Sequence, residues 1–201
     1  MKHFMSGILL LSSCLLHGQN LKISAGYGFS IGEKQNYKRI MAAKTLQAGH
    51  EFELTWNTSL IPLVEFKQLQ YSYDDINGAN IFSKNSFISV PVVLRKYFNA
   101  SKRSRLFTDL GLQGSYYLNI KNEIRNGTAS SLIRAKHNGI GFNFGIAVAA
   151  GLKMTINDRQ SFDVGMFAVK DFWAQKESTG WMKNNAINFT ISYYQALKRT
   201  K

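Results

Sequence analysis

Along most of the chain, apolar and polar residues alternate with a period of two, which is the pattern of β-strands whose two faces meet different surroundings. The clearest stretch spans residues 140–154, where large apolar side chains alternate with glycine, alanine, asparagine and lysine. Eight segments share this alternation, and the pattern indicates neither a helix nor a second domain between them. The eight predicted strands are 21–31, 45–56, 61–73, 88–94, 106–120, 140–154, 162–169 and 187–194.

The connectors between these strands alternate in length. The short ones are 57–59, 99–104 and 157–160, and the long ones are 32–43, 74–85, 121–138 and 174–184. Short turns at one end and long loops at the other are typical of bacterial outer-membrane barrels, whose short turns face the periplasm. Several strands also reach the ~9–11 residues that a tilted membrane strand needs. The sequence therefore predicts an all-β fold, an eight-stranded antiparallel up-and-down transmembrane β-barrel with four long extracellular loops.

The two faces of the sixth predicted strand indicate which side meets lipid. Phe142, Phe144 and Ile146 lie on one face, and Gly141 and Gly145 lie on the other. Glycine and alanine make a poor surface toward water, whereas they fit a crowded, narrow lumen. We therefore expect the bulky face to contact acyl chains and the small or polar face to line the interior.

The N-terminus has the composition of an export signal. A short positive region precedes an apolar core at residues 7–16, and Gly18 and Gln19 form a small-residue cleavage region. The core is too short to span a bilayer as a helix, which needs ~20 apolar residues. The predicted organisation is a signal peptide at 1–18 followed by an outer-membrane barrel domain at 19–201.

Cys14 is the only cysteine, so an internal disulfide is impossible. Residues 11–14 also resemble a lipobox, which would make Cys14 an acylated N-terminus. The apolar run continues through Leu15 and Leu16, which favours cleavage further on.

Composition and charge agree with a barrel and argue against a nucleic-acid partner. Charged residues make up 18% of the chain, against ~25% in soluble domains. The net charge is +13 and the pI is about 9.9, but the basic residues form no helix or stripe with interleaved aromatics. They lie in connectors and at strand ends, where outer-membrane lipid and lipopolysaccharide are the expected partners. A solvated basic surface is the alternative that explains the same charges. These residues include Lys34, Lys38, Arg39, Lys102, Arg103, Arg105, Lys198, Arg199 and Lys201.

Several charged residues fall on strand faces that we expect to point inward. Buried charges must be paired or hydrated, and eight strands enclose a lumen that side chains roughly fill. The sequence therefore predicts an internal ion-pair network and no open pore, with Arg95 beside Asp109 because their strands adjoin. The candidates are Arg95, Asp109, Glu51, Glu53, Lys153 and Asp163.

No catalytic, cofactor-binding or metal site is predicted. After export the chain would retain only His50 and His137, and a barrel-type lipid hydrolase needs a histidine and serine set with an orienting group. Glu123 and Ser131 share a loop region with His137, but a hydrophilic loop explains that spacing. A lipid-modifying enzyme therefore stays an alternative that no motif favours, as does a secreted soluble barrel.

Residues 87–98 (FISVPVVLRKYF) resemble the signature strand of the outer membrane protein beta-barrel domain family of Bacteroidetes, with aliphatics around a proline and then basic and aromatic residues. The resemblance implies an eight-stranded, porin-like barrel in the outer membrane. The family also includes PorT-type proteins linked to protein secretion. A strand that contains Pro91 is expected to bulge there. The chain departs from the usual terminal aromatic, so the barrel-assembly machinery would have to recognise Tyr193 or Tyr194.

Overall fold

The structure, a computed structural model, describes residues 20–30, 41–74, 80–98, 103–126, 129–133, 141–174 and 185–197. The predicted signal peptide lies outside these residues. The described strands are β1 (Asn20–Ser30), β2 (Met41–Thr55), β3 (Thr58–Asp74), β4 (Asn80–Phe98), β5 (Ser104–Asn126), β6 (Ala129–Ile133), β7 (Phe142–Asn157), β8 (Gln160–Ala174) and β9 (Ala186–Ala196). In this part of the chain, no helix is long and apolar enough to cross a membrane.

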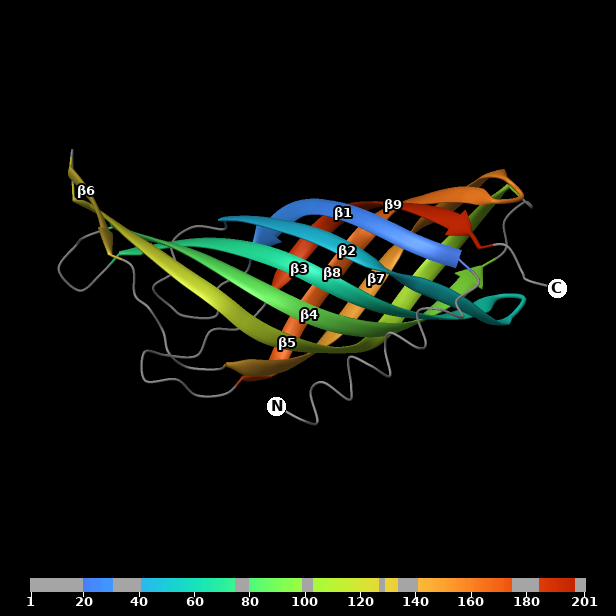
Figure 1. The fold of residues 1–201 in the computed structure, drawn as a ribbon, viewed down its shortest axis with the longest axis horizontal. Helices are drawn as coiled ribbons and strands as arrows, with labels where there is room; N and C mark the ends of the chain where they lie inside the picture. Colours follow the sequence, from blue (N-terminus) through green and yellow to red (C-terminus); the bar gives the residue numbers. More distant parts are fainter. Residues whose placement is uncertain are drawn as a thin grey trace.

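Eight of the strands close into a barrel, which confirms the predicted fold class (Figure 1). Each pairs in antiparallel fashion with its neighbours, and β1 pairs with β9 along its whole length to close the sheet. β5 pairs with both β4 and β7, whereas β6 pairs only with the far end of β5. β6 is therefore the return strand of a hairpin outside the barrel. Within the barrel each strand pairs on both sides, whereas β3 beyond Leu69 pairs only with β4.

Three adjacent strands extend well past the others at the end of the barrel that carries the predicted long loops, here called the long-loop end (Figure 1). β3, β4 and β5 contain 17, 19 and 23 residues. Asp74 pairs with Asn80, so residues 75–79 form that connector, and the β5–β6 hairpin occupies much of 121–138. The prediction of a long loop at 74–85 was therefore wrong, and the loop predicted at 121–138 is largely a hairpin. The reason is that backbone pairing continues where side-chain alternation fades.

The orientation of the two strand faces is confirmed. On β7, Phe144 and Ile146 are 46% and 43% exposed, whereas Gly145 and Ala147 between them are buried. The same rule holds around the barrel, where 28 large apolar side chains of the described residues are exposed. Most charged residues of the strands and many small ones face the interior together with some apolar side chains, so the molecule is apolar outside and mixed inside.

The height of the apolar surface matches a bilayer. On β5 the outward apolar residues run from Leu106 to Leu118, both of which are exposed. Twelve steps at ~3.3 Å cover about 40 Å along the strand. A strand tilt of ~40° reduces this span to about 30 Å, the thickness of the hydrocarbon core.

Small lumen residues are required where neighbouring strands approach closely. A Cβ atom added to Gly28 of β1 would lie 1.9 Å from the carbonyl oxygen of Ile187 on β9. One added to Gly111 of β5 would lie 2.1 Å from the carbonyl oxygen of Val92 on β4. Since backbone atoms cannot move aside as a side chain can, these positions accept only glycine without displacing a strand.

The bulge expected at Pro91 is absent. The β3–β4 ladder omits the pairs at Leu63 and Val64 but resumes in the same register, and Pro91 pairs with Gln113 on its other side. The nearest shift in register on β4 lies between Ser86 and Phe87. A gap in one ladder accommodates the missing proline N–H donor without an extra residue.

Candidate functional site in the charged lumen

Arg95 is the centre of a buried charge cluster inside the barrel. It projects inward from β4 and is 1% exposed. Its Nε and Nη2 atoms donate to the two carboxylate oxygens of Asp109 at 2.7 and 2.8 Å, which is a bidentate pair. Its Nη1 atom donates to Asp163 Oδ2 and to the Tyr194 hydroxyl, both at 2.8 Å. The guanidinium carbon lies 3.6 Å from the centre of the Phe107 ring, so one face of the cation is also covered.

A second buried pair lies beside this cluster. Lys153 Nζ of β7 donates to Glu51 Oε2 of β2 at 2.5 Å and to the Tyr97 hydroxyl at 3.1 Å. Tyr97 in turn donates to the other oxygen of Glu51. Lys22 is buried nearby, with its ammonium 5.5 Å from the centre of the Tyr194 ring. These groups join strands from opposite sides of the barrel, which is possible because the lumen is narrow.

The charges of this end of the lumen balance. Three cations, Arg95, Lys153 and Lys22, face three carboxylates. The carboxylates are those of Glu51, Asp109 and Asp163. A balanced and hydrogen-bonded set of buried charges avoids the large penalty of an unpaired ion.

Five of the six predicted lumen residues contact one another in these two groups. The exception is Glu53, which is exposed and lines an opening at one end of the barrel. This end carries the predicted short turns and is here called the short-turn end. The β2–β3 ladder shifts register between Glu53 and Thr55, beside the turn that ends the pair. Alternation still directs Glu53 toward the axis, but there is no packed interior at that height.

An apolar layer separates this cluster from the long-loop end. Ile61, Leu63, Val93, Phe167 and Val169 pack together with exposures of at most 4%. Side chains of β3, β4 and β8 thus meet across the lumen at this height. The layer therefore fills part of the lumen with apolar side chains.

A further ion pair follows above the apolar layer and was missed from the sequence. Glu65 and Lys67 lie on the inner face of β3 with 3.0 Å between Nζ and Oε2, and both are fully buried. Thr45 and Gln47 of β2 donate to the other oxygen of Glu65 at 2.7 and 3.0 Å. The signal was present, because both residues share a strand face with Leu63 and Leu69. A strand face that mixes charged and apolar residues gives no clear indication of which side points inward.

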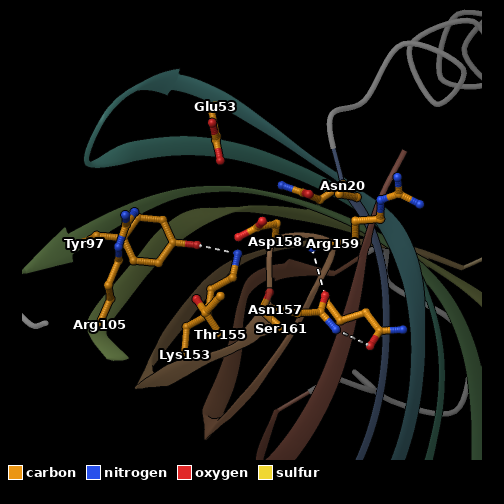
Figure 2. Close-up of a pocket in the computed structure, with 12 residues that line it drawn as sticks. Asn20, Glu53, Tyr97, Arg105, Lys153, Thr155, Asn157, Asp158, Arg159 and Ser161 are labelled. Carbon is orange, nitrogen blue, oxygen red and sulfur yellow. Dashed lines mark hydrogen bonds between the residues drawn. The ribbon is translucent and has the colours of Figure 1, made fainter. Parts of the chain in front are cut away.

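A small cleft opens at the short-turn end of the lumen (Figure 2). Its volume is about 170 Å³, and its lining includes Glu53, Tyr97, Arg105, Lys153 and Arg159. Figure 2 shows the Lys153 ammonium directed at the Tyr97 hydroxyl at the inner end of this space. Since that ammonium is already paired with Glu51, the cleft ends at the charge cluster.

The described residues offer little chemistry beyond charge pairing. Among them no group of three or more histidine, cysteine, aspartate and glutamate side chains is placed to hold a metal ion. His50 lies beside Phe52, with ring centres 6.4 Å apart. His137 is outside the described residues, as are the side chains of Glu123 and Ser131.

An eight-stranded antiparallel barrel with an apolar exterior and a charged, filled interior has the fold of small outer-membrane β-barrels. Solved structures agree with this class. The chain is similar to neisserial surface protein A (NspA), with 10% identity over 89% of this chain and 96% of that one and a TM-score of 0.52. It is also similar to the outer membrane protein OprG from Pseudomonas aeruginosa, with 8% identity over 90% and 97% of the two chains and a TM-score of 0.54. No family model and no curated protein matches the sequence.

Proposed function

We propose that the protein is an integral outer-membrane β-barrel, exported by its N-terminal signal, which presents a structural or binding surface to the outside and has no diffusive pore. The exposed apolar belt carries this proposal. In water, 28 exposed large apolar side chains would form patches far larger than soluble monomers tolerate. In a bilayer the same side chains replace water with acyl chains, and every barrel strand keeps its backbone hydrogen bonds.

The interior supports a closed rather than a conducting barrel. A diffusive porin needs a wide, water-filled lumen, which larger strand numbers provide. Here the neutral charge cluster around Arg95 and the apolar layer around Phe167 occupy the lumen in succession. Any recognition by this protein is therefore expected on its outer loops, on the extended β3–β4–β5 strands and on the lipid-facing surface.

The resemblance of residues 87–98 to the Bacteroidetes barrel family fits this proposal and stays a prediction. We propose that its partners are outer-membrane lipid, lipopolysaccharide and the barrel-assembly machinery. We also propose that the protein uses no cofactor and is not an enzyme. An accessory role in protein secretion or envelope maintenance would require a further partner, either at the long-loop end or at the cleft of the short-turn end.

Fractionation combined with surface proteolysis tests the location. The full chain is expected in the outer-membrane fraction and to resist carbonate extraction, and external protease should cut only in connectors at the long-loop end. Release by carbonate would refute the membrane assignment, and cleavage at the turn around Asp158 in intact cells would refute the orientation.

Planar-bilayer recordings test the filled lumen separately. The purified protein is expected to insert without a steady conductance. A variant with Phe167→Ala and Leu63→Ala removes side chains from the apolar layer and serves as the comparison. A large, steady conductance from the unaltered protein would refute a closed lumen while leaving the membrane location intact.

A further inference from the structure

Three neighbouring strands carry an unbroken apolar row across the outside of the barrel. Leu46 of β2 pairs with Phe66 of β3, which pairs with Ile88 of β4. The three side chains are 56%, 45% and 37% exposed and face outward. In the membrane proposed above, this row would contact acyl chains.

The next outward row toward the long-loop end is polar. Lys44 pairs with Gln68 and Gln68 with Ser86, while one step higher Gln70 pairs with Lys84. Lys44 is exposed, and the other four residues are half-buried. These five residues, here called the lysine patch, begin where the apolar belt ends, so their height is that of the lipid head groups.

The two lysines of the patch are spaced to share one anion. They lie two strands apart, which is about 10 Å sideways at ~4.8 Å per strand. The offset of two residues adds about 7 Å along the strand, so the Cα atoms are about 12 Å apart. Two flexible four-carbon side chains can converge on an oxyanion across that distance. Within the described part of the chain neither ammonium has an ion-pair partner.

We propose that the lysine patch binds a phosphate group of a phosphorylated glycolipid in the outer leaflet, of the lipopolysaccharide type. The inference rests on the proposed function, because that function places the long-loop end outside the cell. Two cations match a phosphate in charge, and the side-chain amides of Gln68 and Gln70 supply neutral donors for its oxygens. The apolar row beneath would hold the acyl chains of the same molecule, which favours a lipid over a free anion.

Lipid retention measured by native mass spectrometry tests this site. The full-length protein is reconstituted in phosphatidylcholine vesicles with either diphosphoryl lipid A or the same lipid without phosphates. We expect the phosphorylated form to be retained preferentially. Each substitution, Lys44→Gln or Lys84→Gln, should weaken retention about fivefold, which corresponds to about 1 kcal/mol per lysine. The double variant should weaken it about 25-fold.

Lys96→Gln is the matched control. Lys96 is also an exposed, outward lysine of β4, but it pairs with Thr58 and Thr108 at the short-turn end. Its replacement should leave retention unchanged. Loss equal to that of the patch variants would show that positive charge in general, rather than this site, attracts the lipid, and would overturn the proposal.

Two further outcomes would also overturn it. One is unchanged retention in the double patch variant, with folding verified by its heat-dependent shift on a gel. The other is full displacement of lipid A by inorganic phosphate, which would indicate a simple anion site. A barrel that inserts stably into vesicles but prefers neither lipid would refute the patch alone, whereas failure to insert at all would refute the proposed function.

Discussion

Replacing Arg95 by methionine removes the group that connects the most strands of the barrel. Methionine has a similar volume and no charge, but it ends about where the guanidinium begins, so four hydrogen bonds and the contact with the Phe107 ring are lost. The carboxylates of Asp109 and Asp163 would remain, 5% and 1% exposed, without the cation that bridges them. Lys153 is paired with Glu51, and an ammonium cannot reproduce the bidentate geometry at Asp109.

The magnitude follows from the cost of leaving a buried charge unpaired. Removing one partner of a buried ion pair costs about 3–5 kcal/mol. Two carboxylates are affected here, but water entering from the cleft beside Lys153 offsets part of the penalty. We therefore expect Arg95→Met to lower the free energy of unfolding by about 4 kcal/mol. The free energy of unfolding of Arg95→Lys should lie between those of the unaltered protein and Arg95→Met, because an ammonium keeps the charge but cannot bind Asp109 with a planar fork.

Urea unfolding in lipid vesicles, followed by tryptophan fluorescence, measures this loss. Arg105→Met is the matched control, since Arg105 is an exposed arginine at the short-turn end and its loss should change stability by less than about 0.5 kcal/mol. A double-mutant cycle of Arg95→Met with Asp109→Asn isolates the pair. If Arg95→Met unfolds within about 1 kcal/mol of the unaltered protein, the reasoning about buried charge is refuted.

Three further predictions use the same unfolding assay. Leu110→Arg places a charge on an outward position that is 64% exposed, and in the proposed membrane it should cost about 2–4 kcal/mol. An equal effect from Leu110→Ala would contradict the lipid-facing assignment. Gly28→Ala directs a Cβ into the β9 backbone and should lower the free energy of unfolding by about 2 kcal/mol or more. Gly114→Ala should lower it less, because the nearest contact of its Cβ is a phenyl ring 3.0 Å away. A larger loss from Gly114→Ala than from Gly28→Ala would disprove the close-approach argument. Lys67→Met alone should cost about 3–5 kcal/mol because it leaves the Glu65 carboxylate buried without its cation. Adding Glu65→Leu should restore part of this loss but not all, because Thr45 and Gln47 then lose their acceptor. No recovery at all in the double variant would contradict the cost assigned to the unpaired carboxylate.

The contact between Arg95 and Asp109 could be anticipated from strand order alone. Their strands are consecutive, and consecutive antiparallel strands pair, so inward residues at similar heights meet. Asp163 and Tyr194 are different. They reach Arg95 from β8 and β9, and only closure of the sheet brings those strands across from β4.

The ends of the strands also depended on the fold. β4 begins at Asn80, eight residues before the predicted start, and β5 continues to Asn126. Residues there need not alternate, because past the apolar belt neither face has a strong preference for apolar side chains. The neighbouring strand supplies hydrogen bonds regardless of side chain, so pairing continues where the pattern stops.

Alternation along the sequence by itself determined the class of fold and which face of each strand points outward, since the period of two is a local property and burial selects side chains at every second position. The tertiary structure alone decided which charges meet, which apolar side chains pack across the lumen and how far the sheet extends at the long-loop end. Those features arise from residues distant in the chain, and their positions are set only when β1 pairs with β9 and the sheet becomes a barrel.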